Sequence, residues 1–403
     1  MMKIKDYIPI VGKFIVDDLR ILAEKLKSKK IQHVNSTAVG GGVAEILNRM
    51  VPLLKELGVE TRWDVIKGGS KFFDVTKKFH NALHGKDEGL TADDFEVFLE
   101  TGRRNEQEMD IWGDIVFIHD PQPITLINRR TENKWLWRCH VDVSSPDPTV
   151  WKFLQDFIFR YDSAIFSAPS FSRQLPIRQF LIAPSIDPLS DKNKELSQET
   201  VDATFRKYEV PRDKPVITQI SRFDRLKDPV GVIKTYKQVK KHIDSRLVLA
   251  GGTASDDPEG QQVLDEVREE AQKDPDIHIL LLPQNDIEIN ALQAGSDVIL
   301  QKSLKEGFGL TISEALWKAK PVVASNVGGI PLQVKHGYSG LLCNSVEGAA
   351  YSIKQLLSNT AYAKKLGENG KEHVRNNFLL TRHLRDYMLV FLSLYHPEDI
   401  VCL

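Results

Sequence analysis

The chain has 403 residues, of which 41% are hydrophobic and 27% charged, a composition typical of globular proteins and unlike that of fibres or membrane bundles. Its 54 Lys and Arg residues balance 55 Asp and Glu residues, which excludes a large net field that would attract nucleic acid or an acidic membrane. Its cysteines, Cys139, Cys343 and Cys402, lie far apart without C-x-x-C spacing, which argues against a disulfide framework or a zinc site.

Residues 1–20 lack the continuous apolar run of a secretory signal, because charged residues interrupt each short apolar stretch. No later run of about 18 uncharged apolar residues indicates a membrane span. We therefore expect a soluble, cytoplasmic protein with reduced cysteines and small-molecule partners, and with no nucleic-acid or membrane partner. A homodimer is compatible with these features.

In the first half of the chain, short apolar segments alternate with helical stretches after a helical lead-in that ends near Lys30. The expected strands are residues 31–37, 61–67, 114–120, 135–141, 163–168 and 179–184. Continuous rather than alternating apolar strands between helices predict a parallel sheet that is covered on both faces.

Residues 182–197 are rich in proline, serine and charge, which is typical of an interdomain linker. A second strand series follows at residues 215–221, 246–252, 277–283, 296–301 and 320–325. We therefore predict an α/β protein of two Rossmann-like domains, residues 1–187 and 188–380, whose parallel sheets face a central cleft. An amphipathic segment within residues 381–403 is expected to form a helix that packs back on the N-terminal domain.

Two carboxylates, Glu306 and Glu314, lie on either side of a glycine-containing turn in the segment KEGFGLTISEALW. The turn follows an expected strand and leads into an expected helix, and ligands of open α/β sheets bind at such carboxyl ends of strands. By spacing alone, a solvated loop acid and an ordinary helix acid would be the more common interpretation. The position of EGFG between strand and helix favours a ligand site.

Two basic residues, Arg222 and Lys227, follow the first strand of the second half in ITQISRFDRLKDP. A guanidinium and an ammonium in one loop can bind a diphosphate, the first bidentately and the second as a point charge. A solvated basic loop balanced by Asp224 and Asp228 is an equally simple interpretation of this segment taken alone. Its position in the same domain as the two glutamates favours a nucleotide site.

Three consecutive glycines, Gly40 to Gly42, lie between the first expected strand and a helix. A dinucleotide-binding turn is disfavoured, because G-x-G-x-x-G is not matched and no acidic residue clearly ends the second strand. The interpretation that the residues alone leave is a tight turn needed for packing the strand against the helix.

His119 and His140 each follow an apolar strand and are expected to face the cleft, although a single histidine in such a place is usually structural. Nearby polar side chains are candidates for binding the hydroxyl groups of an acceptor. They are Glu45, Asp120, Gln122 and Asp142.

The C-terminal half resembles the retaining family-4 glycosyltransferases of GT-B fold, through the E-x7-E element EGFGLTISE and the segment SRFDRLKD. The resemblance implies that Arg222 and Lys227 bind the donor diphosphate, and that Glu306 contacts the transferred sugar. It also implies that Glu314 binds the ribose and that His140 orients the sugar near the reacting carbon. The remaining donor-binding positions that it implies are Gly41, Gly42, Gly307, Phe308, Gly309 and Leu310.

One departure from the family pattern is Asp228, which follows Lys227 at a position where these enzymes usually carry glycine. It is expected to place an extra acid near the donor phosphates. No Asp-x-Asp or histidine ligand set is present, so no obligatory metal is expected, although Mg²⁺ could stimulate turnover.

A narrower resemblance, covering about residues 31–395, is to the archaeal and bacterial trehalose glycosyltransferring synthases. It rests on HVNSTAVGGGVAEIL, FFDVTKKFHNALHG, HDPQP, WLWRCHVDVSSP and PSIDPLSDKN. The resemblance implies transfer of glucose from UDP- or ADP-glucose to free glucose, giving α,α-trehalose and NDP. A trehalose phosphorylase, a transferase with another acceptor and a non-catalytic sugar-binding protein are the alternatives.

Overall fold

The computed structural model describes residues 3–39, 41–252, 258–282, 285–399, 401 and 403. These residues form two compact units, one made of Met1–Ser185 together with Leu380–Leu403 and the other of Ile186–Leu379. The first unit is therefore discontinuous in sequence, and the second is a single segment. Within the described residues, no helix is long and apolar enough to cross a bilayer.

Unit 1 contains a parallel sheet of six strands in the order β2-β1-β3-β4-β5-β6. Its strands are β1 Lys30–Asn35, β2 Glu60–Val65, β3 Ile115–His119, β4 Lys134–Cys139, β5 Ser163–Phe166 and β6 Arg178–Leu181. Its helices are η1 Ile4–Tyr7, α1 Ile8–Val11, α2 Lys13–Leu26, α3 Gly41–Glu56, α4 Ser70–Leu83, α5 Ala92–Glu108, η2 Ile124–Arg129, α6 Pro148–Ile158, η3 Pro169–Phe171 and α15 Leu380–Ser393.

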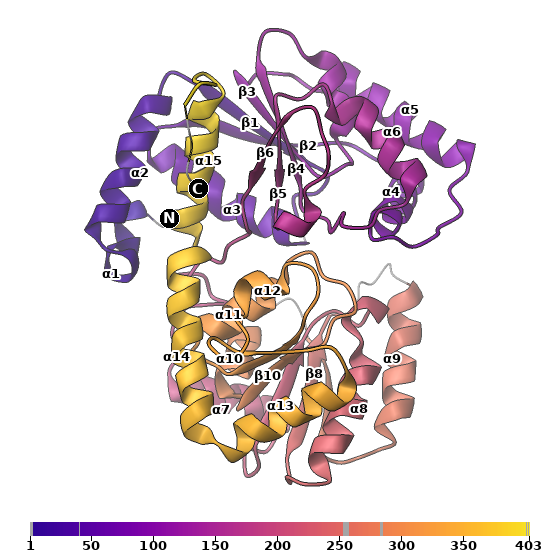
Figure 1. The fold of residues 1–403 in the computed structure, drawn as a ribbon, viewed down its shortest axis with the longest axis vertical. Coiled ribbons are helices and arrows are strands. Elements are labelled where there is room, and N and C mark those ends of the chain that lie inside the picture. Colours follow the sequence, from indigo (N-terminus) through magenta and orange to yellow (C-terminus); the bar gives the residue numbers. More distant parts are fainter. Residues whose placement is uncertain (1–2, 40, 253–257, 283–284, 400, 402) are drawn as a thin grey trace. The chain divides into compact units, whose positions relative to one another are not determined.

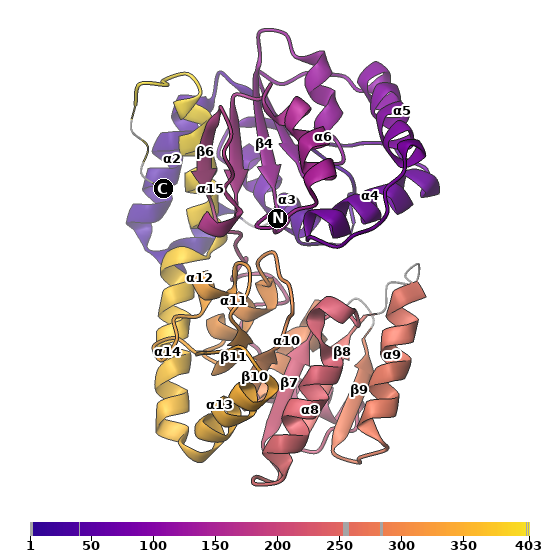
Figure 2. The same cartoon turned by 45° about the vertical axis from the view of Figure 1, so that its right-hand side comes forward.

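The helices of unit 1 lie on both faces of its sheet, with α2 and α15 on one side and α4, α5 and α6 on the other (Figure 1). The C-terminal helix α15 packs beside α2, and Figure 2 shows the two adjacent. Phe391 and Tyr387 of α15 contact Phe117 of β3, with ring centroids 5.7 Å and 5.0 Å apart. The last helix of the chain thus completes the core of the unit that contains its first residues.

Unit 2 contains a second parallel sheet of six strands, in the order β12-β11-β10-β7-β8-β9. Its strands are β7 Val216–Ile220, β8 Arg246–Gly251, β9 Ile277–Leu281, β10 Val298–Gln301, β11 Val322–Ser325 and β12 Leu341–Cys343. Its helices are α7 Gln198–Lys207, η4 Arg225–Lys227, α8 Pro229–Lys240, α9 Pro258–Ala271, α10 Asp286–Gly295, α11 Leu310–Trp317, α12 Ile330–Gln333, α13 Val346–Ser358 and α14 Thr360–Asn377.

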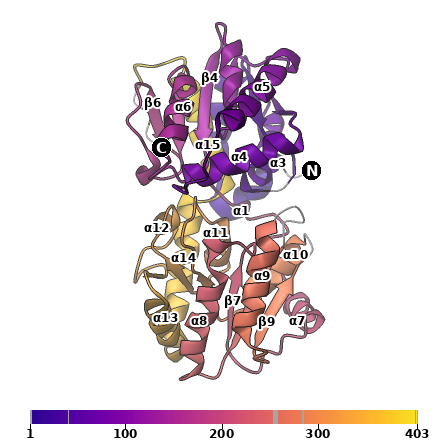
Figure 3. The ribbon, with the colours of Figure 1, turned by 90° about the vertical axis from the view of Figure 1, so that its right-hand side faces the viewer.

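Successive residues along the unit 2 strands belong to two different apolar clusters, as expected for a sheet that is buried on both faces. Ile217 and Leu247 pack with residues of α8, α9 and α13, whereas Val216 and Val248 pack with residues of α7 and α10. In the view of Figure 3, β7 is seen between α8 and α9.

The predicted fold class, two parallel-sheet α/β domains, is confirmed by these two sheets. Strand β12 was not predicted from the sequence, because a three-residue edge strand offers too short an apolar run to be recognised. Gly41 and Gly42 were expected in a loop, whereas they are the first residues of α3. Gly40 lies outside the described residues.

Candidate functional site

The two segments singled out in the second half of the chain meet because β7 and β10 are neighbours in the sheet. The backbone N–H of Leu304 donates to the carbonyl of Leu226 at 2.7 Å. The buried Gln219 side chain joins the same loops, since it donates to the Lys227 carbonyl at 3.0 Å and accepts from the Lys302 N–H at 3.1 Å. The loops after β7 and β10 therefore form one surface at the carboxyl end of the sheet.

Lys227 and Glu306 are in direct contact on this surface. The Lys227 Nζ donates to Glu306 Oε2 at 2.6 Å, and the Ser303 hydroxyl donates to the same oxygen at 3.1 Å. Their side chains are only 19% and 10% exposed. An ammonium has three donors, so Lys227 keeps hydrogen-bonding capacity for an incoming anion while Glu306 neutralises its charge.

Arg222 is the more open of the two basic residues, with 66% of its side chain exposed. Its Nη2 lies 3.3 Å from Asp224 Oδ2, a contact of the weak class typical of exposed ion pairs. The Asp224 side chain in turn accepts the Lys227 backbone N–H at 3.1 Å and so caps the N-terminus of η4. The loop is thus held by Asp224 while the Arg222 guanidinium can reorient toward an anion.

Asp228 does not present its charge as an unpaired acid, which changes the expectation for the phosphate site. Its Oδ1 accepts the Gly231 N–H at 3.0 Å and caps α8, and its Oδ2 forms an ion pair with Lys302. The residue has φ +48°, in the left-handed region where glycine is usual and aspartate is tolerated. Lys302, which the sequence analysis did not single out, neutralises the acid.

The EGFG turn is held by close backbone contacts to the segment after β11. Gly328 has φ +55°, and a Cβ placed on it would lie 1.7 Å from the Glu306 carbonyl oxygen. The Gly329 N–H donates to the Gly307 carbonyl at 3.2 Å. Gly309, with φ +82°, precedes α11 and provides no side-chain cap. The N–H groups of the first turn of α11, which begins at Leu310, are therefore suited to an anion.

Phe308 and Glu314 are more buried than a simple ligand-contact role would suggest. The Phe308 ring packs against Phe378, with centroids 5.5 Å apart, so only its backbone belongs to the turn. Glu314 is 2% exposed, and its carboxylate lies 3.4 Å from Gln293 Nε2 and 3.9 Å from Lys192 Nζ.

Another lysine, Lys318, directly follows α11 and lies beside Glu314, and it was not recognised in the sequence. Its Nζ donates to Gln293 Oε1 at 2.8 Å and to the Glu314 carbonyl at 3.1 Å. Burial lowers the pKa of Lys318 to about 7, with the Glu314 carboxylate opposing and Lys192 reinforcing the shift. The surroundings of Glu314 are therefore polar and closely hydrogen-bonded.

In unit 1, His140 and Asp120 are joined at the ends of the neighbouring strands β3 and β4. Asp120 Oδ1 accepts the His140 backbone N–H at 2.8 Å, and the Asp120 backbone is left-handed, with φ +65°. Burial raises the pKa of Asp120 to about 6, although the His140 hydrogen bond and Arg138 act in the opposite direction. His119 Nδ1 lies 3.3 Å from His140 Nε2, so both predicted histidines belong to one cluster.

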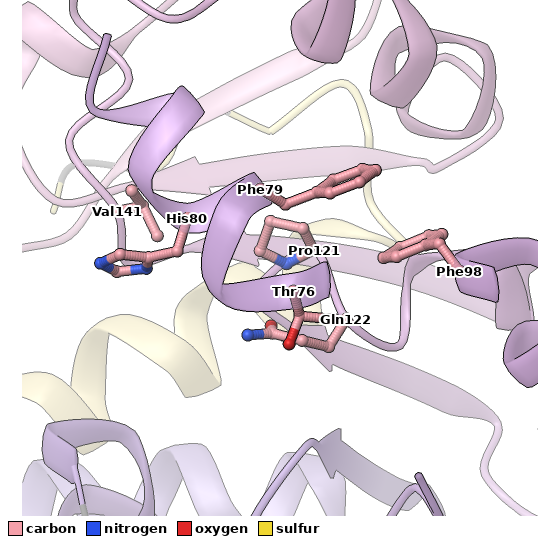
Figure 4. Close-up of a pocket in the computed structure, with 7 residues that line it drawn as sticks. All are labelled: Thr76, Phe79, His80, Phe98, Pro121, Gln122 and Val141. Carbon is pink, nitrogen blue, oxygen red and sulfur yellow. The ribbon is translucent and has the colours of Figure 1, made fainter. Parts of the chain in front are cut away.

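The other acceptor candidates of unit 1 do not form a single group. Asp142 is buried, and its Oδ1 accepts the Ser144 N–H at 2.9 Å, which shapes the loop after β4. Glu45 is half-buried on α3. Gln122 borders a small pocket, shown in Figure 4, and its Oε1 is buried with no hydrogen-bond partner among the described residues. The pocket is lined by Thr76, Phe79, His80, Phe98, Pro121, Gln122 and Val141.

The described part of the chain contains no group of three or more His, Cys, Asp or Glu side chains that could hold a metal ion. The dispensability of a metal stays a prediction. Cys139 and Cys343 are buried and free, and Cys402 lies outside the described residues.

Comparison with known proteins gives the family. A family model described as trehalose synthase, N-terminal domain, matches residues 33–173, and one described as glycosyl transferases group 1 matches residues 200–373. The chain is 43% identical over 400 residues to the trehalose synthase of Pyrococcus horikoshii, covering 97% of this chain and 96% of that protein. It belongs to the trehalose synthase family. As a member of this family, the protein is a glycosyltransferase. The chain is also 42% identical over 403 residues to the trehalose synthase of Rubrobacter xylanophilus, covering 96% of each chain.

More distant similarities extend to other enzymes of this fold. The trehalose phosphorylase of Grifola frondosa is 32% identical over 408 residues, which cover 88% of this chain and 55% of that protein. A structure of sucrose-phosphate synthase from Thermosynechococcus elongatus matches with a TM-score of 0.73 at 16% identity, covering 92% of this chain and 100% of the other. At that identity the structural match supports the GT-B fold alone.

Proposed function

We propose that the protein transfers the glucosyl group of a nucleoside-diphosphate glucose, UDP- or ADP-glucose, to free glucose with retention. The products are α,α-trehalose and NDP. The observation that carries the proposal is the contact between Lys227 and Glu306 beside the uncapped N-terminus of α11, in a chain of the trehalose synthase family. This group combines a cation, a carboxylate and a helix N-terminus without a side-chain cap, which suits a substrate with a diphosphate and a sugar.

The donor diphosphate would bind Arg222, Lys227 and the N–H groups at the start of α11, since a guanidinium, an ammonium and a helix N-terminus all favour anions. Glu306 would accept hydrogen bonds from hydroxyls of the transferred glucose, and Glu314 would bind the ribose. Backbone groups would supply the remaining donor contacts. They are those of Gly41, Gly42, Gly307, Phe308, Gly309 and Leu310.

In the transfer step, the bond between the anomeric carbon and the diphosphate oxygen breaks, and a bond to the acceptor hydroxyl oxygen forms on the same face. The departing diphosphate oxygen takes the proton of the acceptor hydroxyl. Arg222 and Lys227 stabilise the negative charge that develops on the diphosphate, a role for fixed charges that lowers the barrier. His140 holds the transferred glucose, and Glu45, Asp120, Gln122 and Asp142 are the proposed acceptor ligands.

A trehalose phosphorylase is the second candidate, because a phosphorylase shares 32% identity with most of this chain. The share of each relative that aligns with this chain favours the synthase. This share is 96% for the Pyrococcus horikoshii synthase and 55% for the Grifola frondosa phosphorylase.

The deciding experiment incubates the enzyme with UDP-, ADP- or GDP-glucose and free glucose, with and without EDTA, and identifies the disaccharide and its linkage. We expect α,α-trehalose and stoichiometric NDP, with activity retained in EDTA and no obligatory cofactor. Production of glucose 1-phosphate from trehalose and inorganic phosphate, with no trehalose from any NDP-glucose, would assign a phosphorylase instead. Stimulation by Mg²⁺, cytoplasmic location and a homodimer stay predictions.

A further inference from the structure

Three histidines of unit 1 form a continuous line across adjacent strands. His33 lies on β1, His119 ends β3 and His140 follows β4, and these strands are consecutive in the sheet. His33 Nδ1 lies 3.1 Å from His119 Nε2, and His119 Nδ1 lies 3.3 Å from His140 Nε2. The register pairs His33 with Phe117 and His119 with Arg138, so the alternation of side chains brings all three rings to one face.

The line runs from the core of unit 1 to its surface. His33 is fully buried and His119 is 1% exposed, whereas His140 is half-buried. Phe391 and Tyr387 of α15 cover the inner part through their contacts with Phe117. Water therefore reaches only the outer end, at His140.

All three rings are neutral at ordinary pH. Burial lowers the pKa of His33 to about 3 and the pKa values of His119 and His140 well below their usual range. The charged and titratable groups that act on the line, Arg138 and His383, push in the same direction. A neutral imidazole donates through one nitrogen and accepts through the other, so only two arrangements of protons satisfy both hydrogen bonds of the line.

The inner end of the line distinguishes the two arrangements. Among the described residues, His33 Nε2 is buried and has no hydrogen-bond partner. With the proton on Nε2 of every ring, His33 has an unpaired N–H there. With the proton on Nδ1 of every ring, His33 has only an unpaired acceptor there, which proteins tolerate more often. The Phe391 ring, 6.3 Å away between centroids, is at most a weak acceptor. The favoured arrangement therefore has the proton on Nδ1 of every ring.

We propose that His33 and His119 act as positioning residues that fix the tautomer of His140, so that its Nδ1 carries the proton and donates to an oxygen of the sugar. No hydrogen bond engages this Nδ1 within the described part of the chain. The Asp120 carboxylate fixes the backbone of His140 independently, through the N–H bond at 2.8 Å. The sugar contact rests on the proposed function, whereas the tautomer can be measured without substrate.

The test is NMR of the full-length, ligand-free enzyme labelled with ¹⁵N in histidine, with the His140 signals assigned from a His140→Gln variant. Long-range proton–nitrogen correlations distinguish Nδ1–H from Nε2–H. We expect Nδ1–H at His140 in the wild-type enzyme. An Nε2–H tautomer there would overturn the proposal.

Variants of His119 then test the positioning role. His119→Phe keeps an aromatic ring but can neither accept from His33 nor donate to His140, so the Nδ1–H preference of His140 should be lost. The kcat should fall about tenfold, as expected for one weakened hydrogen bond, with little change in the KM for the donor. His119→Gln, whose amide both donates and accepts, should restore part of the kcat.

The matched control is His278→Phe, which changes another histidine on a strand, in β9 of unit 2, and should alter neither the tautomer nor kcat. An unchanged His140 tautomer in His119→Phe would disprove the positioning role. If the wild-type enzyme shows Nδ1–H but forms no trehalose from any NDP-glucose, the proposed function fails and the tautomer assignment stands.

Discussion

The ion pair between Lys227 and Glu306 shows how the charges of the candidate donor site are balanced before a substrate binds. Both side chains are largely buried, and the pair is reinforced by Ser303. Burying either charge alone would be costly, and in this pair each charge neutralises the other. The Asp228 and Lys302 pair follows the same rule on the adjacent loop. Arg222 differs, because it is mostly exposed and only weakly paired.

Two arginines of one loop allow a matched comparison of the proposed diphosphate contact. Arg222→Gln should lower kcat/KM for NDP-glucose about a hundredfold, because a charge that stabilises the developing diphosphate is lost. Arg225 instead makes two hydrogen bonds to Glu266, at 2.9 Å and 2.6 Å, so Arg225→Gln should change kcat/KM little. Steady-state kinetics with both variants gives the comparison, and equal losses would contradict the assignment of Arg222.

The raised pKa of Asp120 predicts a pH dependence of stability. Burial raises it to about 6 from an ordinary 3.8, so between these pH values the unfolded chain loses the proton while the folded chain keeps it. The stability that this group contributes is complete below pH 3.8 and is lost as the pH rises through 6. Asp120→Asn stays neutral and can still accept the His140 N–H.

The stability of Asp120→Asn relative to the wild type should therefore increase between pH 4 and pH 6 and then level off. Urea unfolding of both proteins at a series of pH values measures this difference. A difference that is constant with pH would show that the carboxyl group of Asp120 titrates normally.

At the scale of elements, the loops at the carboxyl ends of β7, β10 and β11 are joined by backbone hydrogen bonds, by the Gln219 side chain and by the ion pairs of Lys227 and Lys302. The Gly328 backbone approaches the Glu306 carbonyl so closely that no side chain fits between them. The turn that carries Glu306 is therefore positioned by a glycine that the sequence analysis did not select. Its signal in the sequence, the pair Gly328 and Gly329 after an apolar strand, is recognisable only once the strand order is known.

Gly328→Ala should destabilise the protein and displace Glu306, because the new Cβ would lie 1.7 Å from a carbonyl oxygen. Gly337→Ala is the matched control, since Gly337 also has positive φ, +76°, but its added Cβ meets nothing within 4 Å. The control should cost about 1 kcal/mol through backbone strain alone, and Gly328→Ala should cost about 3 kcal/mol or more. Thermal unfolding and NDP titration measure both effects, and similar losses in the two variants would argue against the close contact.

At the scale of the whole molecule, the two units differ in whether they are formed by one continuous segment of the chain or by two separate segments. Unit 2 is one continuous segment, Ile186–Leu379, with apolar clusters on both faces of its own sheet. Unit 1 depends on the last residues of the chain, because the buried Leu384, Met388 and Phe391 of α15 belong to its core.

A fragment of residues 186–379 should therefore fold alone and bind NDP, whereas residues 1–185 alone should expose the apolar surface that α15 covers. Adding residues 380–403 to the second fragment through a flexible linker should restore a cooperative fold. Circular dichroism, dye binding and thermal unfolding of the three fragments test this. Cooperative unfolding of residues 1–185 without the C-terminal helix would contradict the dependence on α15.

The sequence by itself determined the fold class and the family, because buried parallel strands leave continuous apolar runs and because EGFGLTISE and SRFDRLKD are local patterns. Only the tertiary structure decided how the charges are paired. Lys227 and Glu306 lie 79 residues apart and meet because β7 and β10 become neighbours after intervening crossovers. The ion pair between Asp228 and Lys302 likewise depends on strand order. The line from His33 to His140 depends on strand order and on burial, which lowers the pKa of each of its rings. No local sequence pattern records either of these.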